Sequence, residues 1–154
     1  MSTNNVRAIA LISVGLLLLG NIVFAVIIQD TVRLEQPIRA IHGRVSNHGN
    51  AIPSVWVDVY DNAQVCLDHS MTPAEKRKRQ TKIVSLKPKA DGEFSIRHLP
   101  MGLYEVEFGN HGMGGYNVLS VLVNVDPKGL PGALCVYLGR EGEGQSTVFN
   151  CFAR

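Results

Sequence analysis

The chain has 154 residues, and its 15 Lys and Arg against 13 Asp and Glu give a formal net charge of +2. The part after the first 36 residues leaves room for one domain of about 100 residues with a single core, which argues against a multidomain protein. Aromatic residues make up only 6% of the chain, so few side chains could serve as platforms for sugar binding.

The first predicted element is an uncharged apolar run of 21 residues, 8–28. As a helix rising about 1.5 Å per residue it would be roughly 32 Å long, enough to cross a hydrocarbon core of about 30 Å. We therefore predict one N-terminal transmembrane helix over 8–28, preceded by a short segment, 1–7. The alternative is a secretory signal peptide, with a cleavage site near Ala25.

The charges on either side of this run predict its orientation. Arg7 and the terminal amine precede it, whereas Asp30, Arg33 and Glu35 follow it and nearly cancel. The positive-inside rule then predicts a single-pass membrane protein with a cytoplasmic N-terminus and a periplasmic or extracellular C-terminal domain; the alternative is secretion after signal cleavage. Residues 29–37 are polar and end at Pro37, which predicts a short stalk.

Beyond the stalk, apolar and polar residues alternate in short runs. In the clearest example Tyr104, Val106 and Phe108 share one face, and the earlier pair Asp91 and Gly92 supplies a turn. A period of two with turn residues between runs indicates half-buried antiparallel strands. About seven such runs predict an all-β fold over 38–139, a single seven-stranded antiparallel β-sandwich, followed by a C-terminal tail, 140–154.

Four segments follow one another at a recognisable spacing: 41–45, 49–59, 91–96 and 99–106. Together they resemble the carboxypeptidase regulatory-like domain, a transthyretin-like β-sandwich that some classifications group with carbohydrate-binding-like modules. The resemblance covers about 38–139 and implies a regulatory rather than a catalytic module. The chain departs from the family in a longer, more basic stretch at 61–82 and in its tail.

Residues 72–82 form a basic loop. Thr72, Pro73 and Glu75 occupy the N-cap, N1 and N3 positions of a capping box, which predicts a short surface helix over about 73–80. The loop carries five cationic residues: Lys76, Arg77, Lys78, Arg79 and Lys82. These predict contact with an anionic partner such as lipid headgroups or an acidic subunit, or else a merely solvated loop. No nucleic acid is expected, because the loop lacks interleaved aromatic residues.

Trp56, Asp58 and Tyr60 share one face of a predicted strand, opposite Val57 and Val59. If they are exposed, the two rings could stack on a pyranose, so these three residues form the candidate sugar or partner face. The alternative is that another element covers this face and the rings pack in the usual way.

The three cysteines are predicted to lie in a compartment that permits disulfides. Because three is an odd number, at least one of them is unpaired or bonded to another chain. A bond between Cys135 and Cys151 would close a loop of about 15 residues, worth on the order of 3 kcal/mol. The alternative is that all three, Cys66 included, are free thiols.

No catalytic pattern stands out in the sequence. Cys66 and His69 lack the second pair of ligands that a structural zinc site needs, and neither a nucleophile elbow nor a dinucleotide-binding unit is present. We expect no enzyme activity, no cofactor and no metal. The sequence predicts a non-catalytic, membrane-anchored interaction module, an accessory or scaffolding subunit of a larger membrane complex. The alternative is a carbohydrate-binding or enzyme-regulatory module of a secreted or surface protein.

Overall fold

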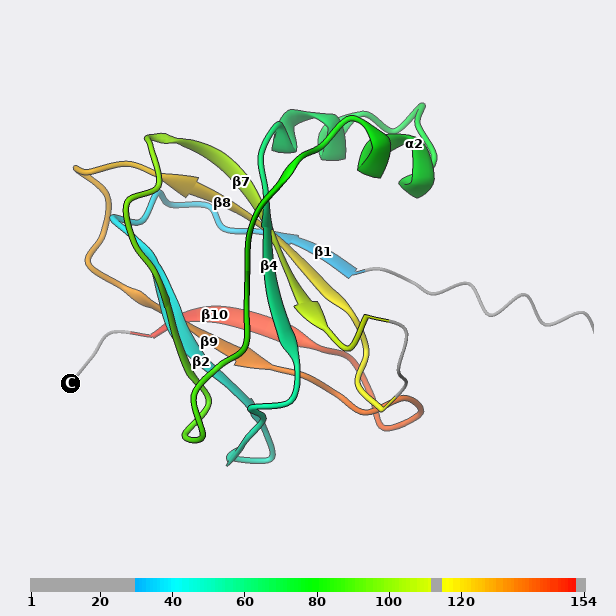
Figure 1. Ribbon diagram of the computed structural model, residues 1–154, viewed down its shortest axis with the longest axis vertical. Coiled ribbons are helices and arrows are strands. Elements are labelled where there is room, and N and C mark those ends of the chain that lie inside the picture. The colour runs from blue at the N-terminus through cyan, green and yellow to red at the C-terminus, as the bar shows by residue number, and fades with distance from the viewer. Residues whose placement is uncertain (1–29, 112–114, 152–154) are drawn as a thin grey trace, which may run out of the picture.

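The structure, a computed structural model, describes residues 30–111 and 115–151. Within these ranges ten β-strands form two sheets that enclose one core (Figure 1). The described part of the chain is therefore mostly β, as its alternation predicts.

Five strands make up sheet A. Their spatial order is β1 (Asp30–Arg33), β8 (Leu119–Val125), β7 (Gly102–Gly109), β4 (Trp56–Tyr60) and β5 (Lys82–Leu86). β1 runs parallel to β8, whereas the other neighbours are antiparallel.

Sheet B also has five strands. They are β10 (Thr147–Cys151), β9 (Ala133–Tyr137), β2 (Ile41–Asn47) and β3 (Asn50–Ala51) in that order, with β6 (Glu93–Ile96) also paired to β2. β2 and β9 are parallel, and β9 and β10 are antiparallel.

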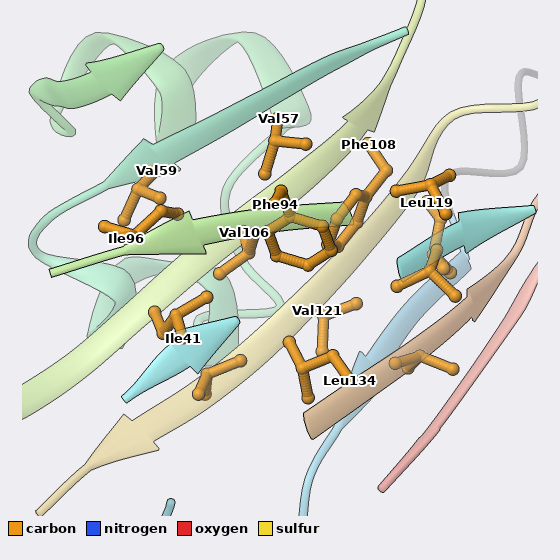
Figure 2. Close-up of a cluster of buried hydrophobic side chains, with 14 of the residues drawn as sticks. Ile41, Val57, Val59, Phe94, Ile96, Val106, Phe108, Leu119, Val121 and Leu134 are labelled. Carbon is orange, nitrogen blue, oxygen red and sulfur yellow. The ribbon is translucent and has the colours of Figure 1, made fainter. Parts of the chain in front are cut away.

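The core lies between the two sheets, where side chains from both point toward one another (Figure 2). The predicted alternation holds along β7, whose Tyr104, Val106 and Phe108 are all buried. Phe108 also meets Phe94 of β6 edge to face, with ring centroids 5.4 Å apart. The apolar positions of the clearest sequence runs thus become the centre of the core.

The connection between β4 and β5, residues 61–81, is called the insert below. It contains the 3₁₀-helix η1 (Ala63–Leu67) and the α-helix α2 (Pro73–Lys78), and both lie at the end of β4 (Figure 1). The predicted capping box is confirmed: Glu75 N–H donates to Thr72 Oγ1, and Thr72 N–H donates to the Glu75 carboxylate. Such a cap stabilises a short helix by satisfying its free N–H groups.

The prediction of seven antiparallel strands is wrong in number and in pairing, because ten strands and two parallel pairs are present in the described residues. Alternation reveals that a segment is a strand, but it carries no information about which strand lies beside it. Two strands come from segments with other predicted roles. β1 lies in the predicted stalk, 29–37, and β10 lies in the predicted tail, 140–154.

Both extra strands join the body because of a few apolar side chains. Val32 and Leu34 pack against the core beside β8, and Val148 of β10 is buried. The predicted transmembrane helix, 8–28, lies outside the described residues. None of the helices in 30–111 and 115–151 combines the length and apolar character needed to span a bilayer.

Candidate functional site

Three carboxylates come together on the outer face of sheet A. Asp58 of β4 lies opposite Glu107 of β7, and the next pair on the same face is Tyr60 with Glu105. Asp58 and Glu105 are buried, and the Glu107 side chain is only 18% exposed. Like charges that face each other across strands repel, so this acidic cluster requires cations.

Arg77 of α2 supplies one cation to two of the carboxylates. Its guanidinium lies 2.5 Å from Glu107 Oε2 and 3.3 Å from Glu105 Oε2. The same group lies over the Tyr60 ring, 3.7 Å from its centroid. The insert therefore closes over sheet A through an ion pair and a cation–π contact.

Asp58 is held by three donors. Lys82 Nζ and Ser85 Oγ, both from β5, lie 2.7 and 2.5 Å from its carboxylate oxygens, and His111 Nε2 lies 2.5 Å away. Burial by itself would raise the pKa of Asp58, but the hydrogen bonds from Lys82, Ser85 and His111 outweigh it and hold the pKa below its usual value. Asp58 therefore remains ionised in the folded protein.

Glu105 and Glu107 differ in their surroundings. Glu105 accepts hydrogen bonds from Ser120 Oγ at 2.5 Å and Gln80 Nε2 at 2.6 Å. Burial raises the pKa of Glu105, but these hydrogen bonds and Arg77 more than offset it, so the pKa is lowered. For Glu107 burial prevails over the attraction of Arg77, and the pKa is raised. Of the two, Glu107 is the one that takes up a proton first.

Cys66 of η1 completes the buried edge of the cluster. Its Sγ donates to Glu105 Oε2 at 3.2 Å and accepts from Gln80 Nε2 at 3.3 Å. Burial and the neighbouring Glu105 carboxylate raise the pKa of the Cys66 thiol to about 12. At neutral pH the sulfur is a protonated thiol and a poor nucleophile.

A pocket of about 170 Å³ lies between the insert and sheet A. It is lined by Thr31, Cys66, Pro73, Lys76, Arg77, Gln80 and Glu105. Its charged groups already have partners within the chain, since Lys76 Nζ donates to the Cys66 carbonyl oxygen at 2.9 Å and Arg77 binds Glu105. Within the described ranges, no three His, Cys, Asp or Glu side chains are placed to hold a metal ion.

The structure covers two of the three residues of the candidate sugar or partner face on β4. Asp58 and Tyr60 are 1% and 6% exposed, because the insert and β5 cover them. The Trp56 ring stacks on His111 with centroids 4.9 Å apart and planes 5° apart, and Lys87 Nζ lies 4.8 Å from the same ring. Both rings thus have partners inside the protein, and Trp56 remains partly exposed.

The basic loop also differs from the prediction of a cationic contact surface. Lys76, Arg77 and Lys82 turn toward the cluster or the insert backbone, whereas Lys78 and Arg79 are exposed. Arg77 and Lys82 pair with the carboxylates of sheet A, and Lys76 donates to a backbone carbonyl oxygen. Members of both candidate sites therefore belong to one cluster of ion pairs inside the protein.

Sequence reasoning missed Glu105, Glu107, Gln80, Ser120 and His111 as members of this cluster. One signal could have indicated the two glutamates. They lie two residues apart on the polar side of a predicted strand, in a chain whose cations are concentrated in one loop. Nothing local indicates that β7 lies beside β4.

On the opposite side of the molecule, Cys135 of β9 and Cys151 of β10 form a disulfide, with Cα atoms 5.7 Å apart. This is the pairing that the spacing favours, and Cys66 is the free cysteine. The bond lies on the outer face of sheet B, where neighbouring Phe149 is 57% exposed. It ties the last described strand to the body.

Comparison of the sequence with models of known protein families gives no match, and comparison with curated proteins gives none either.

Proposed function

We propose that this chain is a non-catalytic, membrane-anchored interaction module, an accessory or scaffolding subunit of a larger membrane complex. The observation that carries the proposal is the cluster of ion pairs on sheet A. Arg77 and Lys82 are held by Glu105, Glu107 and Asp58 within the protein. These ion pairs hold the insert and β5 against the outer face of sheet A. Their role is therefore structural.

The chemistry of the cluster supports the same reading. A thiol with a pKa near 12 is a weak nucleophile at neutral pH. Asp58 and Glu105 have lowered pKa values, so neither is a good base near neutral pH, where a general base needs a pKa close to the working pH.

The Cys135–Cys151 disulfide supports an extracytoplasmic location for the domain. Disulfides persist in oxidising compartments and are rare in the cytosol. In this proposal residues 8–28 cross the membrane, and the domain of residues 30–151 lies on the periplasmic or extracellular side.

Recognition would fall on exposed apolar side chains outside the cluster of ion pairs. Phe149, Met101, Ile83 and Leu67 are the large apolar side chains that are exposed among the described residues. We also propose that the fold is of the transthyretin-like kind found in carboxypeptidase regulatory-like domains. In support, the segments that carry the resemblance coincide with β2, β6 and β7.

Co-purification tests the proposal. The full chain, tagged at its C-terminus, is extracted from its native membrane in a mild detergent, and the proteins bound to it are identified by mass spectrometry. We expect other membrane proteins in fixed proportion to the chain. The matched control is residues 30–154 exported to the same compartment behind a cleavable signal, which should lose most of these partners. Recovery of the full chain with no other protein would refute the proposal.

A further inference from the structure

β10 is an edge strand of sheet B without the usual protection of such an edge. It lies at one end of the strand order, beside β9, and its sequence TVFNC contains no charge and no proline (Figure 1). The edges of sheet A differ, because β1 carries Arg33 and β5 begins at Lys82. Exposed edges commonly carry charges that prevent pairing with another chain.

The register of sheet B shows which backbone groups of β10 face outward. Leu138 N–H donates to the Ser46 carbonyl oxygen on β2 at 3.0 Å, so the even-numbered residues of β9 direct their backbone groups toward β2. The odd-numbered residues of β9 therefore face β10, where their partners are Thr147, Phe149 and Cys151. The N–H and C=O groups of Val148 and Asn150 point to the free edge, because backbone direction alternates along a strand.

We propose that β10 pairs antiparallel with β10 of a second copy of this chain, extending sheet B across a two-fold axis beside Phe149. Val148 of each copy then lies opposite Asn150 of the other, and both pairs are of the hydrogen-bonded kind. Phe149 lies opposite Phe149. The segment is self-complementary, as a two-fold interface requires.

The side chains on both faces of β10 fit this pairing. On the outer face the two Phe149 rings, 57% exposed in the single chain, would form a non-hydrogen-bonded pair whose Cα atoms approach to about 4.5 Å. On the inner face a groove of about 280 Å³ opens beside the strand, lined by residues 32–36 with Val148 and Asn150. It has room for the inward-facing Val148 and Asn150 side chains of the second copy.

A charge-swap experiment at Phe149 tests the dimer. The full chain in mild detergent is studied by sedimentation, which gives the protein mass over a range of concentrations. Wild type should dimerise. Phe149→Arg and Phe149→Glu should each weaken self-association at least tenfold, because like charges then face each other, and an equimolar mixture of the two should restore the dimer. The same two substitutions at Met101, which is 71% exposed, should leave the dimer unchanged.

Asn150→Pro is a second test that leaves the outer face intact. It removes an N–H at the free edge without removing a bond to β9, and it should give a monomer. Tryptophan fluorescence of each variant checks that it is folded. A wild-type chain that stays monomeric at every concentration would overturn the proposal, as would Phe149→Arg and Phe149→Glu variants that each dimerise like wild type. If the dimer were held only through residues 8–28, both Phe149 variants would dimerise like wild type.

Discussion

Replacing Arg77 by methionine should destabilise the protein by about 2–3 kcal/mol. Removing one partner of a buried ion pair costs about 3–5 kcal/mol, because the other charge is left buried and unpaired. Arg77 loses contact with two carboxylates, but its side chain keeps 33% exposure, and solvent screening lowers the cost. Methionine keeps much of the apolar stem over Tyr60, so the substitution mainly removes the charge.

Urea unfolding followed by fluorescence measures this loss. Trp56 is the single tryptophan of the chain, and it lies on the same sheet face, stacked on His111. With a slope of about 1–3 kcal/mol per molar urea, the unfolding midpoint should fall by roughly 1–2 M. Arg79→Met is the matched control, since Arg79 is exposed, and its midpoint should hardly move.

The pH dependence of the Arg77→Met effect gives a second readout. The folded-state pKa of Glu107 is raised, so protonating this residue favours the folded state as pH falls through that pKa. Without Arg77 the pKa of Glu107 rises further. The loss in free energy of unfolding relative to wild type should therefore be smaller at pH 5 than at pH 7.5. Adding Glu107→Gln should recover about 1 kcal/mol of the loss. A loss below about 0.5 kcal/mol, or one that is the same at both pH values, would refute the proposed role of the ion pair.

Three further predictions concern other parts of the molecule. Cys66 should react with a thiol reagent at pH 8.5 at least about 100-fold more slowly in the folded protein than in urea, because its raised pKa keeps it protonated. Replacing Cys135 and Cys151 together by serine should lower the free energy of unfolding by about 3 kcal/mol, measured by urea titration. Gly43→Ala should cost more than about 3 kcal/mol or prevent folding, since an added Cβ would lie 1.9 Å from the Leu134 carbonyl oxygen, and circular dichroism would show the loss of strand signal.

Each of these has a result that contradicts it. Equal labelling rates in the folded and unfolded protein would place the thiol of Cys66 in water. A serine pair as stable as wild type would mean that β9 and β10 need no cross-link. An alanine at position 43 with an unchanged midpoint would show that β2 and β9 can move apart freely. Alanine at Gly102, where an added Cβ would lie 3.7 Å from the nearest side-chain atom, serves as the comparison.

The sequence was sufficient to predict the strands whose apolar residues alternate regularly. Tyr104, Val106 and Phe108 are buried as expected, and Thr72 caps α2. Both features are local, because alternation and capping depend on residues within a few positions of each other. β1 and β10 could not be recognised in this way. Each is only four or five residues long. β1 pairs with β8, which is far away in the chain, and β10 joins the body through core contacts of Val148.

The candidate site was only partly predictable for the same reason. Asp58 and the basic loop were identified separately, but their meeting depends on β4 lying between β5 and β7. Glu105 and Glu107 occupy polar positions of a regular alternation, which predicts a face turned to solvent. Because the insert packs over that face, the two glutamates are shielded from solvent instead. Nothing in the sequence of the strand indicates that another element covers it.

The two sheets thus expose different kinds of outer face, and the difference directs where partners bind. On sheet A, the insert places Arg77 and Gln80 over Glu105, so binding there would first require breaking charged contacts in a poorly solvated site. On sheet B, the outer face near the disulfide carries exposed Phe149, and its edge strand is uncharged. Binding on sheet B removes few charged groups from water and buries apolar surface. Substitution of Phe149 should therefore weaken association far more than substitution of Lys78, which lies on the exposed side of the insert.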